Sequence, residues 1–229
     1  MGLVPWNESL PSVLDHTVLR PEATKADVLR LCAEAKEQGF VVIFVPPCYV
    51  DEAVAAVAKT AVQIGIPIGF PLGGHSTHAK VTEAIEAVAH GARVLDMVIN
   101  ISRLKSGDHD YVRRDMAAVV QATPGINHKV ILETCLLTRE EKITACRLAV
   151  EAGMDYVKTS TGFNQAGATV EDVRLMKEAV AGRAKVKASG GIRDWKSTRA
   201  LLEAGADRIG TSASVKIVGE WRAERAAGR

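Results

Sequence analysis

The chain has only four cysteines in its 229 residues, Cys32, Cys48, Cys135 and Cys146. No two of them form a C-x-x-C pair, and a chain of this length does not need disulfide bonds to hold its fold. We therefore expect a reducing compartment, the cytoplasm. We also expect all four side chains to be small buried apolar groups rather than redox centres.

The sequence also lacks long apolar runs and export signals. No apolar stretch approaches the roughly 20 residues needed to span a bilayer. Residues 1–8 have no basic stretch followed by an apolar core, so they do not have the features of a signal peptide. Both absences argue against a membrane protein and agree with a cytoplasmic location.

Neither sign of charge is in large excess. The 29 lysine and arginine residues nearly balance the 27 acidic residues, which gives a net charge of +2. This balance argues against a nucleic-acid-binding surface or a polybasic membrane patch. A local phosphate site remains compatible with it, and the partners we expect are small molecules.

What the sequence does contain is a regular alternation of strand and helix patterns. Short apolar runs lie at 12–16, 41–45, 66–70, 94–99, 130–132, 156–158, 184–188 and 208–210. Helical spacing of Ala, Leu and Val occurs at 24–38, 51–63, 79–90, 110–122, 139–151, 170–181 and 195–204. Eight such units predict an α/β fold, a single (β/α)8 TIM barrel over residues 1–229. A doubly wound open sheet is the alternative, but no G-x-G-x-x-G follows the first strand, which disfavours dinucleotide binding.

Several of these helices carry start and stop signals. Thr24 and Thr138 precede helical runs, and Thr138 is followed by Glu141 in a capping-box arrangement. Glycines follow helical runs where a left-handed C-cap favours glycine, namely Gly39, Gly65, Gly91, Gly153 and Gly205.

Two lysines occupy equivalent places in neighbouring units. Lys158 and Lys187 each follow apolar residues, directly before a small-residue turn that contains glycine. Lysine is rarely buried without a partner or a function. Catalytic groups of a barrel lie at the carboxyl ends of its strands, and both lysines fall there.

A pair of close ammonium groups is one way to make an amine nucleophilic at neutral pH. A lysine with a pKa near ~10.4 is less than about 0.1% neutral at pH 7. A second ammonium group about 4 Å away costs roughly 4 kcal/mol at an effective dielectric constant of ~20, which lowers the pKa by about 3 units. The alternative is that both lysines are structural and pair with carboxylates such as Asp96 and Glu133.

Asp96 stands inside a predicted strand, between Leu95 and Met97. A buried carboxylate there needs a cation or a role in proton transfer. Paired with a lysine, it could also move a proton at a substrate, and a purely structural ion pair is the alternative. The other polar residues in or just after the apolar runs are Asp15, His16, Asn100, Lys129, Glu133, Thr159, Lys185, Thr211 and Ser212.

Loops with glycine and hydroxyl groups follow the last three predicted strands, at 159–162, 188–191 and 210–213. Their candidate binding residues are Thr161, Gly162, Gly190, Gly191, Gly210 and Ser212. The loops after the last strands of a barrel often bind phosphate, because glycine lets backbone N–H groups approach an anion. Each loop alone is a weak signal, but together they predict a phosphate site.

The histidines form no metal-binding pattern. His75 and His78 could be a metal pair, but no carboxylate or cysteine accompanies them at ligand spacing, so we expect no metal site. His90, His109 and His128 belong to no constellation, and we expect them on the surface.

Taken together, these motifs resemble the deoxyribose-phosphate aldolases, class I aldolases with a (β/α)8 barrel. The matching stretches run in family order along nearly the whole chain, at 14–21, 68–73, 95–100, 129–134, 157–163, 186–193 and 208–213. The stretches VKTSTGF and VKASGGIR, which contain Lys158 and Lys187, are the most specific.

The resemblance implies reversible cleavage of 2-deoxy-D-ribose 5-phosphate to acetaldehyde and D-glyceraldehyde 3-phosphate. Carried over, Lys158 is the Schiff-base lysine, Lys187 lowers its pKa, and Asp96 transfers protons. The phosphate would lie against Gly162, Gly190, Gly191 and Ser212. Because the iminium is the electron sink, no metal or organic cofactor is required.

Three segments depart from the family pattern. One is the loop at 73–77, which reads GGHST where Ala-Asn-Thr-Thr is usual, and we expect it to have little effect on the chemistry. After the second strand the family often has a Val-Cys-Val-Asn-Pro type of run, where this chain has Phe44 and Pro46. Phe44 replaces a cysteine that lies near the substrate in some relatives, so we predict better tolerance of high acetaldehyde. Residues 220–229 lack the terminal tyrosine that assists proton transfer in some members, which could slow enolisation unless water takes its place.

Two other functions remain open. One is a phosphate-binding barrel lyase that uses the same lysine chemistry on a different aldehyde or ketone. The other is a non-catalytic phospho-sugar-binding paralogue, although binding alone needs no lysine with a lowered pKa. In each case we expect a homodimer or a higher homo-oligomer, as is plausible for such barrels.

Overall fold

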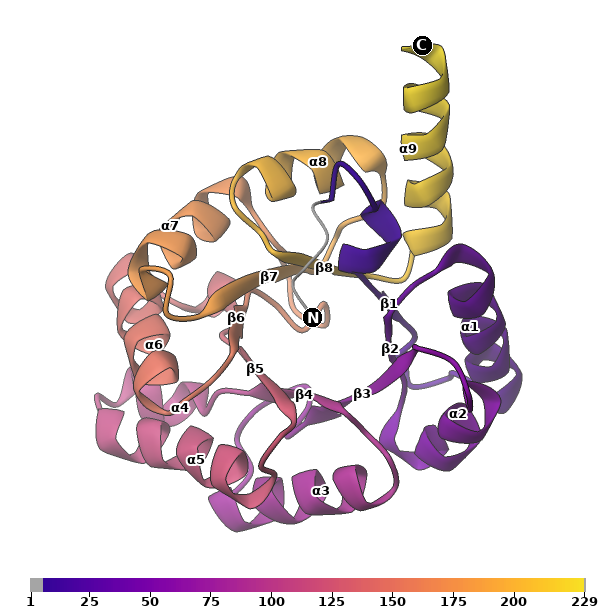
Figure 1. Cartoon of the computed structure of the whole chain (residues 1–229). Coiled ribbons are helices and arrows are strands. Elements are labelled where there is room, and N and C mark those ends of the chain that lie inside the picture. Colours follow the sequence, from indigo (N-terminus) through magenta and orange to yellow (C-terminus); the bar gives the residue numbers. More distant parts are fainter. Residues whose placement is uncertain (1–5, 229) are drawn as a thin grey trace.

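A closed barrel of parallel strands forms the centre of the protein (Figure 1). The computed structural model describes residues 6–228, so the expectation for the extreme N-terminus lies mostly outside it. The strands are β1 (Leu14–Thr17), β2 (Val42–Phe44), β3 (Gln63–Ile68), β4 (Val94–Val98), β5 (Asn127–Ile131), β6 (Tyr156–Lys158), β7 (Lys185–Ser189) and β8 (Arg208–Thr211). They pair in sequence order, and β8 closes on β1.

Helices surround this barrel, as Figure 1 shows. They are α1 (Lys25–Gln38), α2 (Val50–Ala56), α3 (Thr77–Ala89), α4 (Ile101–Lys105), α5 (His109–Ala122), α6 (Arg139–Glu151), α7 (Val170–Val180), α8 (Trp195–Glu203) and α9 (Ser214–Ala227). Short 3-10 helices lie at Leu10–Val13, Pro47–Tyr49 and Thr134–Leu136. The predicted (β/α)8 fold class is confirmed. Among the described residues, no helix combines the length and the apolar character needed to cross a membrane.

Alternation along the strands separates two environments. On β4, Leu95 and Met97 belong to the main apolar cluster that the helices cover, whereas the intervening Asp96 points into the barrel interior. Successive side chains of a strand face opposite sides, so an apolar run with one charged residue directs that charge inward. The interior also holds a small separate apolar cluster of Val42, Phe44 and Val94.

The predicted helix over 51–63 was wrong at its C-terminal end. Helix α2 ends at Ala56, and residue 63 already begins β3. Lys59 has φ +64, a left-handed conformation that a helix cannot continue through. Thr60 then accepts a hydrogen bond from Val62 N–H and donates one to the carbonyl oxygen of Val57, which closes the turn.

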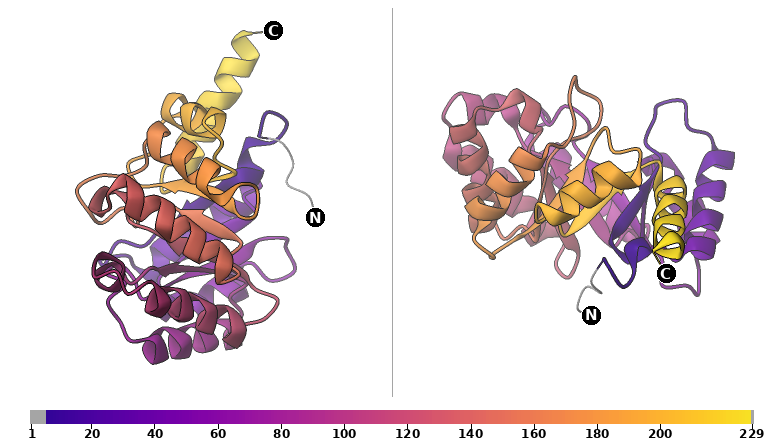
Figure 2. Two further views of the ribbon diagram at one scale, coloured as in Figure 1. Left: turned by 90° about the vertical axis from the view of Figure 1, so that its left-hand side faces the viewer. Right: turned by 90° about the horizontal axis from the view of Figure 1, so that it is seen from above.

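Some of the predicted helix start and stop signals are confirmed and others are wrong. Both Thr24 and Thr138 cap their helices, each within a capping box. Gly39 is the left-handed C-cap of α1, but Gly65 lies inside β3 and caps nothing. Helix α9 was not predicted, and Figure 2 shows its C-terminal part extending away from the barrel.

Burial corrects two expectations about single residues. Cys32 and Cys146 are buried as expected, but Cys48 is exposed and Cys135 is half-buried. His128 is buried rather than on the surface, and its ring nitrogen Nε2 finds a hydrogen-bond partner there in Thr123 Oγ1 at 2.8 Å. Thr123 is the C-cap residue of the preceding helix α5, and a histidine that bonds to such a buried hydroxyl group has no distinguishing signal in sequence.

Candidate active site

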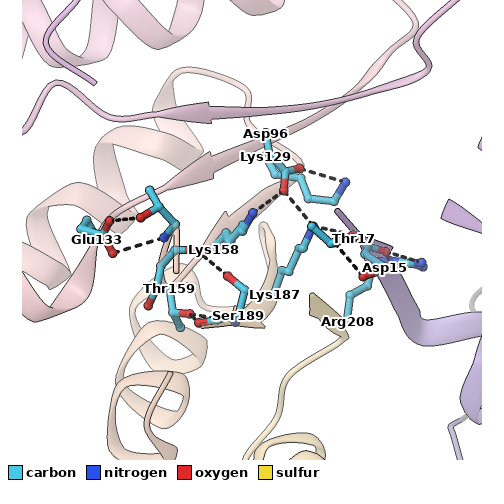
Figure 3. A network of polar contacts seen from close by, with 12 residues as sticks. Asp15, Thr17, Asp96, Lys129, Glu133, Lys158, Thr159, Lys187, Ser189 and Arg208 are labelled. Carbon is cyan, nitrogen blue, oxygen red and sulfur yellow. Dashed lines mark hydrogen bonds and ion pairs between the residues drawn. The ribbon is translucent and has the colours of Figure 1, made fainter. Parts of the chain in front are cut away.

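Three lysines surround one carboxylate inside the barrel (Figure 3). The atom Oδ2 of Asp96 accepts hydrogen bonds from Lys158 Nζ at 2.8 Å and Lys187 Nζ at 2.7 Å. Lys129 Nζ lies 3.4 Å from the other oxygen, Oδ1. Strand register accounts for this meeting, since Asp96 lies beside Lys129 and Lys158 lies beside Lys187. The sequence singled out Lys158, Lys187 and Asp96, and the structure brings them together, with both amines bonded to the same carboxylate oxygen.

A second carboxylate, Asp15 on β1, extends the cluster. It contacts Lys187 Nζ at 2.6 Å and Arg208 Nη2 at 2.7 Å. Lys187 thus bridges two carboxylates, whereas among residues 6–228 Lys158 forms an ion pair with Asp96 alone. All of these side chains are buried. Buried charged groups remain ionised only when they are paired with opposite charges. Here each carboxylate is shared by two or more cations.

Burial and pairing act in opposite directions on the two carboxylates. Burial alone would raise the pKa of Asp96, but Lys158, Lys187 and Lys129 outweigh it and hold the pKa well below its usual range. Asp15 follows the same pattern, with Arg208 and Lys187 lowering its pKa to about 2 against the effect of burial. Both groups are therefore ionised carboxylates at neutral pH.

The pKa of Lys158 is lowered to about 8. Burial is the largest cause, because it disfavours the charged amine; Asp96 opposes it, and the charge of Lys187 lowers the pKa further. The prediction from sequence, which assigned the whole effect to Lys187, was wrong, because burial lowers the pKa more than the charge of Lys187 does. At pH 7 a pKa of about 8 leaves about a tenth of the amine neutral.

The ring of Phe44 lies against the amines. Its centroid is 3.9 Å from Lys187 Nζ, 5.4 Å from Lys129 Nζ and 5.5 Å from Lys158 Nζ. Gly65 makes room for it, because a Cβ there would lie 2.6 Å from a ring carbon. Phe44 therefore keeps water away from one side of the amines.

Three loops approach one another at the carboxyl ends of β6, β7 and β8. Gly162, Gly190 and Gly191 have φ values of +88, +88 and +76, which favour glycine. A Cβ on Gly162 would lie 3.9 Å from Gly190 Cα, so the first two loops are neighbours. Among the described residues, the N–H groups of these glycines and of Ser212 have no intramolecular partner. Free N–H groups in a glycine-rich concavity suit an anion.

Two of the predicted phosphate residues have other contacts. Thr161 donates both its N–H and its hydroxyl group to Glu133. Gly210 lies within β8, where a Cβ would be 2.9 Å from Lys187 Cε, so its lack of a side chain makes space for that lysine. The donors that remain available for an anion are the N–H groups of Gly162, Gly190, Gly191 and Ser212.

An open cleft of about 560 Å³ connects the loops to the lysine cluster. Lys158 reaches its wall, together with Thr161, Gly162, Gly190, Gly191, Gly210 and Ser212. Lys187 and Asp96 are not among the lining residues and lie behind Lys158. The arrangement places one amine of the cluster, and only that lysine, at the edge of a cavity large enough for a phosphorylated sugar.

Some polar candidates lie elsewhere. Lys185 is exposed at the start of β7, away from the cluster. Glu133 contacts no lysine within ion-pair distance in the described part of the chain, and Figure 3 shows it on the far side of Lys158 from Lys187. His75 and His78 are exposed, and residues 6–228 contain no group of three side chains suited to a metal ion.

Comparison with known proteins agrees with this geometry. Residues 12–217 match the family described as DeoC/LacD family aldolase. The chain belongs to the DeoC/LacD family of aldolases. A deoxyribose-phosphate aldolase of Thermoanaerobacter sp. (strain X514) is 53% identical over 216 residues, which cover 93% of this chain and 97% of that protein. The family resemblance inferred from the motifs is confirmed.

Solved structures show the same relationship. A putative deoxyribose-phosphate aldolase from Coccidioides immitis has a TM-score of 0.91 and 46% identity, covering 93% of this chain and 86% of that one. The tetrameric deoxyribose phosphate aldolase from Aeropyrum pernix has a TM-score of 0.88 and 34% identity, covering 95% and 92%.

Sequence reasoning missed the roles of two family-motif residues. Asp15 was noted only as a polar residue near a strand end, and Glu133 was also considered as an ion-pair partner of the lysines, which is wrong within the described residues. The signal for Asp15 was its place in a strand beside the closing strand β8, which carries Arg208. No signal could have assigned Glu133, because its contacts depend on an unusual backbone conformation.

Proposed function

We propose that the protein reversibly cleaves 2-deoxy-D-ribose 5-phosphate to acetaldehyde and D-glyceraldehyde 3-phosphate through a Schiff base on Lys158. The observation that carries the proposal is the position of Lys158, whose amine borders the cleft while bonded to Asp96 within a cluster rich in positive charge. The 53% identical protein from Thermoanaerobacter is named deoxyribose-phosphate aldolase, and this name supports the choice of substrate.

In the first step the neutral amine of Lys158 attacks the aldehyde carbon of the open-chain sugar. The carbinolamine then loses water, and the resulting iminium withdraws electrons from the neighbouring carbon. Asp96 lies 2.8 Å from the amine nitrogen, so it accepts the one proton that this nitrogen loses and passes it to the former carbonyl oxygen, which takes a second proton from solvent and leaves as water. Lys187 remains the counter-ion of Asp96 and Asp15 throughout.

In the second step the bond between C2 and C3 of the sugar breaks. Removal of the proton from the C3 hydroxyl group releases the phosphorylated aldehyde, and the electron pair of the broken bond forms an enamine on the lysine. Protonation at C2 and hydrolysis then release acetaldehyde. Asp96 is the nearest carboxylate to the amine and the proposed proton carrier, directly or through water.

The phosphate is proposed to rest on the N–H groups of Gly162, Gly190, Gly191 and Ser212. Thr161 and Gly210, the other two predicted residues, would act through loop shape and through the position of Lys187. Because the iminium itself is the electron sink, the reaction requires no metal or organic cofactor.

Trapping tests the proposal directly. The protein is incubated with acetaldehyde and borohydride, and the modified residue is identified by mass spectrometry. An ethyl group on Lys158 supports the aldolase, with Lys158→Ala as the unlabelled control. No labelling, with phosphate still bound, would indicate a phospho-sugar-binding protein instead. Labelling without cleavage of the deoxy sugar would indicate a lyase of another phosphorylated substrate.

Assembly and location complete the proposal. We propose a homo-oligomer, which light scattering in solution tests, and the tetrameric Aeropyrum pernix relative supports it. The proposed location is the cytoplasm, which the four free thiols support.

A further inference from the structure

Glu133 is a buried carboxylate whose partners all lie in one loop. It follows β5 and is 0% exposed. Its Oε1 accepts the N–H group of Thr161 at 3.2 Å, and its Oε2 accepts the Thr161 hydroxyl group and Asn164 Nδ2, the latter at 3.0 Å. Within residues 6–228 it has no lysine, arginine or histidine at ion-pair distance. A buried charge is costly unless hydrogen bonds satisfy it, and here only the segment 161–164 supplies them.

The backbone at Glu133 is held in an unusual conformation. Its φ and ψ are +57 and +62, the left-handed region that residues other than glycine rarely adopt. Such conformations persist where the surrounding structure fixes them, and they gather at functional sites. Leu132 N–H bonds to the carbonyl oxygen of Lys158 at 2.9 Å and Thr134 N–H to that of Thr159 at 3.0 Å, so the chain on both sides of Glu133 is tied to the end of β6.

These contacts decide which donors face the cleft. Both donors of Thr161 are occupied by Glu133, and Phe163 N–H bonds back to Thr161 Oγ1 at 3.1 Å. Gly162, between them, keeps a free N–H group among the described residues and lines the cleft. The loop that contains Gly162 therefore takes its shape from Glu133, through Thr161 and Asn164.

We propose that Glu133 is a positioning residue that sets selectivity for the phosphate group, by fixing the segment 161–164 so that Gly162 N–H faces the anion. This inference rests on the proposed function, because it concerns the phosphate of that substrate. It assigns Glu133 no contact with the substrate and no part in bond cleavage. Loss of Glu133 should thus affect substrates with a phosphate and spare the chemistry at Lys158.

The test compares Glu133→Ala and Glu133→Gln with the wild type. For Glu133→Ala, KM for 2-deoxyribose 5-phosphate and the inhibition constant of inorganic phosphate should each rise by about tenfold or more, as expected for a lost charge-assisted hydrogen bond. The rate of borohydride trapping of acetaldehyde at Lys158 should change by less than about twofold, a range within the spread of single-residue effects. Glu133→Gln keeps one acceptor oxygen, so its KM and its inhibition constant for phosphate should lie between those of the wild type and Glu133→Ala.

Glu83→Gln is the matched control, because Glu83 Oε2 also accepts a loop N–H group, that of Gly69 at 2.7 Å, but after β3. It should leave phosphate selectivity unchanged. If Glu133→Ala does not fold, Asn164→Ala removes one of the three bonds and should still raise KM. Equal loss of trapping and of phosphate binding in folded variants would overturn the inference, as would no change in either. Failure to trap acetaldehyde on the wild type would instead reject the proposed function.

Discussion

Two buried lysines of this barrel each bond to an aspartate, yet their surroundings differ. Lys80 Nζ donates to Asp115 Oδ2 at 2.6 Å and to the carbonyl oxygen of Val98 at 3.0 Å. Lys158 Nζ donates to Asp96 at 2.8 Å. Both ion pairs are almost fully buried. Burial beside a carboxylate therefore does not by itself distinguish a structural lysine from a reactive one.

The distinction lies in charge balance and access. Among the described residues, Lys80 is the only cation that pairs with Asp115, whose other oxygen accepts the hydroxyl group of Thr77 at 2.7 Å. Asp96, in contrast, is shared among Lys158, Lys187 and Lys129. Positive charge that exceeds its counter-ions favours a neutral amine, and only the shared cluster meets the cleft.

Lys158→Ala should have the largest effect on activity. It removes the only proposed nucleophile, so turnover of 2-deoxyribose 5-phosphate should fall by more than about a thousandfold. The folded state should persist, because Lys187 and Lys129 still balance Asp96. Steady-state kinetics and thermal unfolding measure the two effects. Retention of more than about a thousandth of the rate would reject the covalent role.

Lys80→Met should do the reverse, with a large effect on stability. It leaves Asp115 buried without a cation, which should lower the free energy of unfolding by about 3–5 kcal/mol. Urea unfolding measures this loss. Acetaldehyde trapping at Lys158 should continue wherever the variant is folded. The double variant Lys80→Met/Asp115→Leu should recover much of the loss. Unchanged stability of the single variant would show that this pair is not a structural clamp.

The two lysines also mark how far the sequence could predict the site. Lys158 ends a short apolar run, so strand periodicity and the barrel rule place it at the catalytic end. Lys80 lies in a helix among polar neighbours, a pattern typical of a surface residue. Its burial depends on Asp115 in another helix, 35 residues away, and no local pattern reports such a contact.

The fold was predictable for a similar reason. Local apolar runs predict the eight strands. Their number and their alternation with helices then predict that the sheet closes into a barrel. The left-handed backbone at Glu133 depends on contacts with the distant segment 161–164, whereas the turn at Lys59 is closed by local hydrogen bonds that the helical spacing of 51–63 did not reveal. Helix α9 was not predicted, although residues 214–227 contain good helix formers such as alanine and glutamate.

Lys187→Leu should sharpen the role of excess charge. In the wild type, activity should rise with pH through about 8, the pKa of Lys158, as the neutral amine becomes available. Removing Lys187 leaves the attraction of Asp96 less opposed, so the pKa of Lys158 rises and less amine is neutral at pH 7. The acidic limb of the rate profile should move up by about one unit, and the rate at pH 7 should fall about tenfold. An unchanged profile would contradict the like-charge effect and leave burial as the only cause.

Phe44→Cys should have only a small effect on basal turnover but a clear effect on resistance to inactivation by acetaldehyde. The ring of Phe44 lies 3.9 Å from Lys187 Nζ, a cation–π contact of about 0.5–2 kcal/mol, so its loss should slow turnover only several-fold. A cysteine there would lie beside ammonium groups, which lower the pKa of a thiol and make it reactive. Inactivation by high acetaldehyde, followed over time, should therefore accelerate in Phe44→Cys and stay slow in the thiol-free control Phe44→Leu. If the wild type loses activity as fast as Phe44→Cys, Phe44 does not protect the enzyme from acetaldehyde. The absence of a thiol beside the buried ammonium groups would then be unimportant for resistance to the aldehyde.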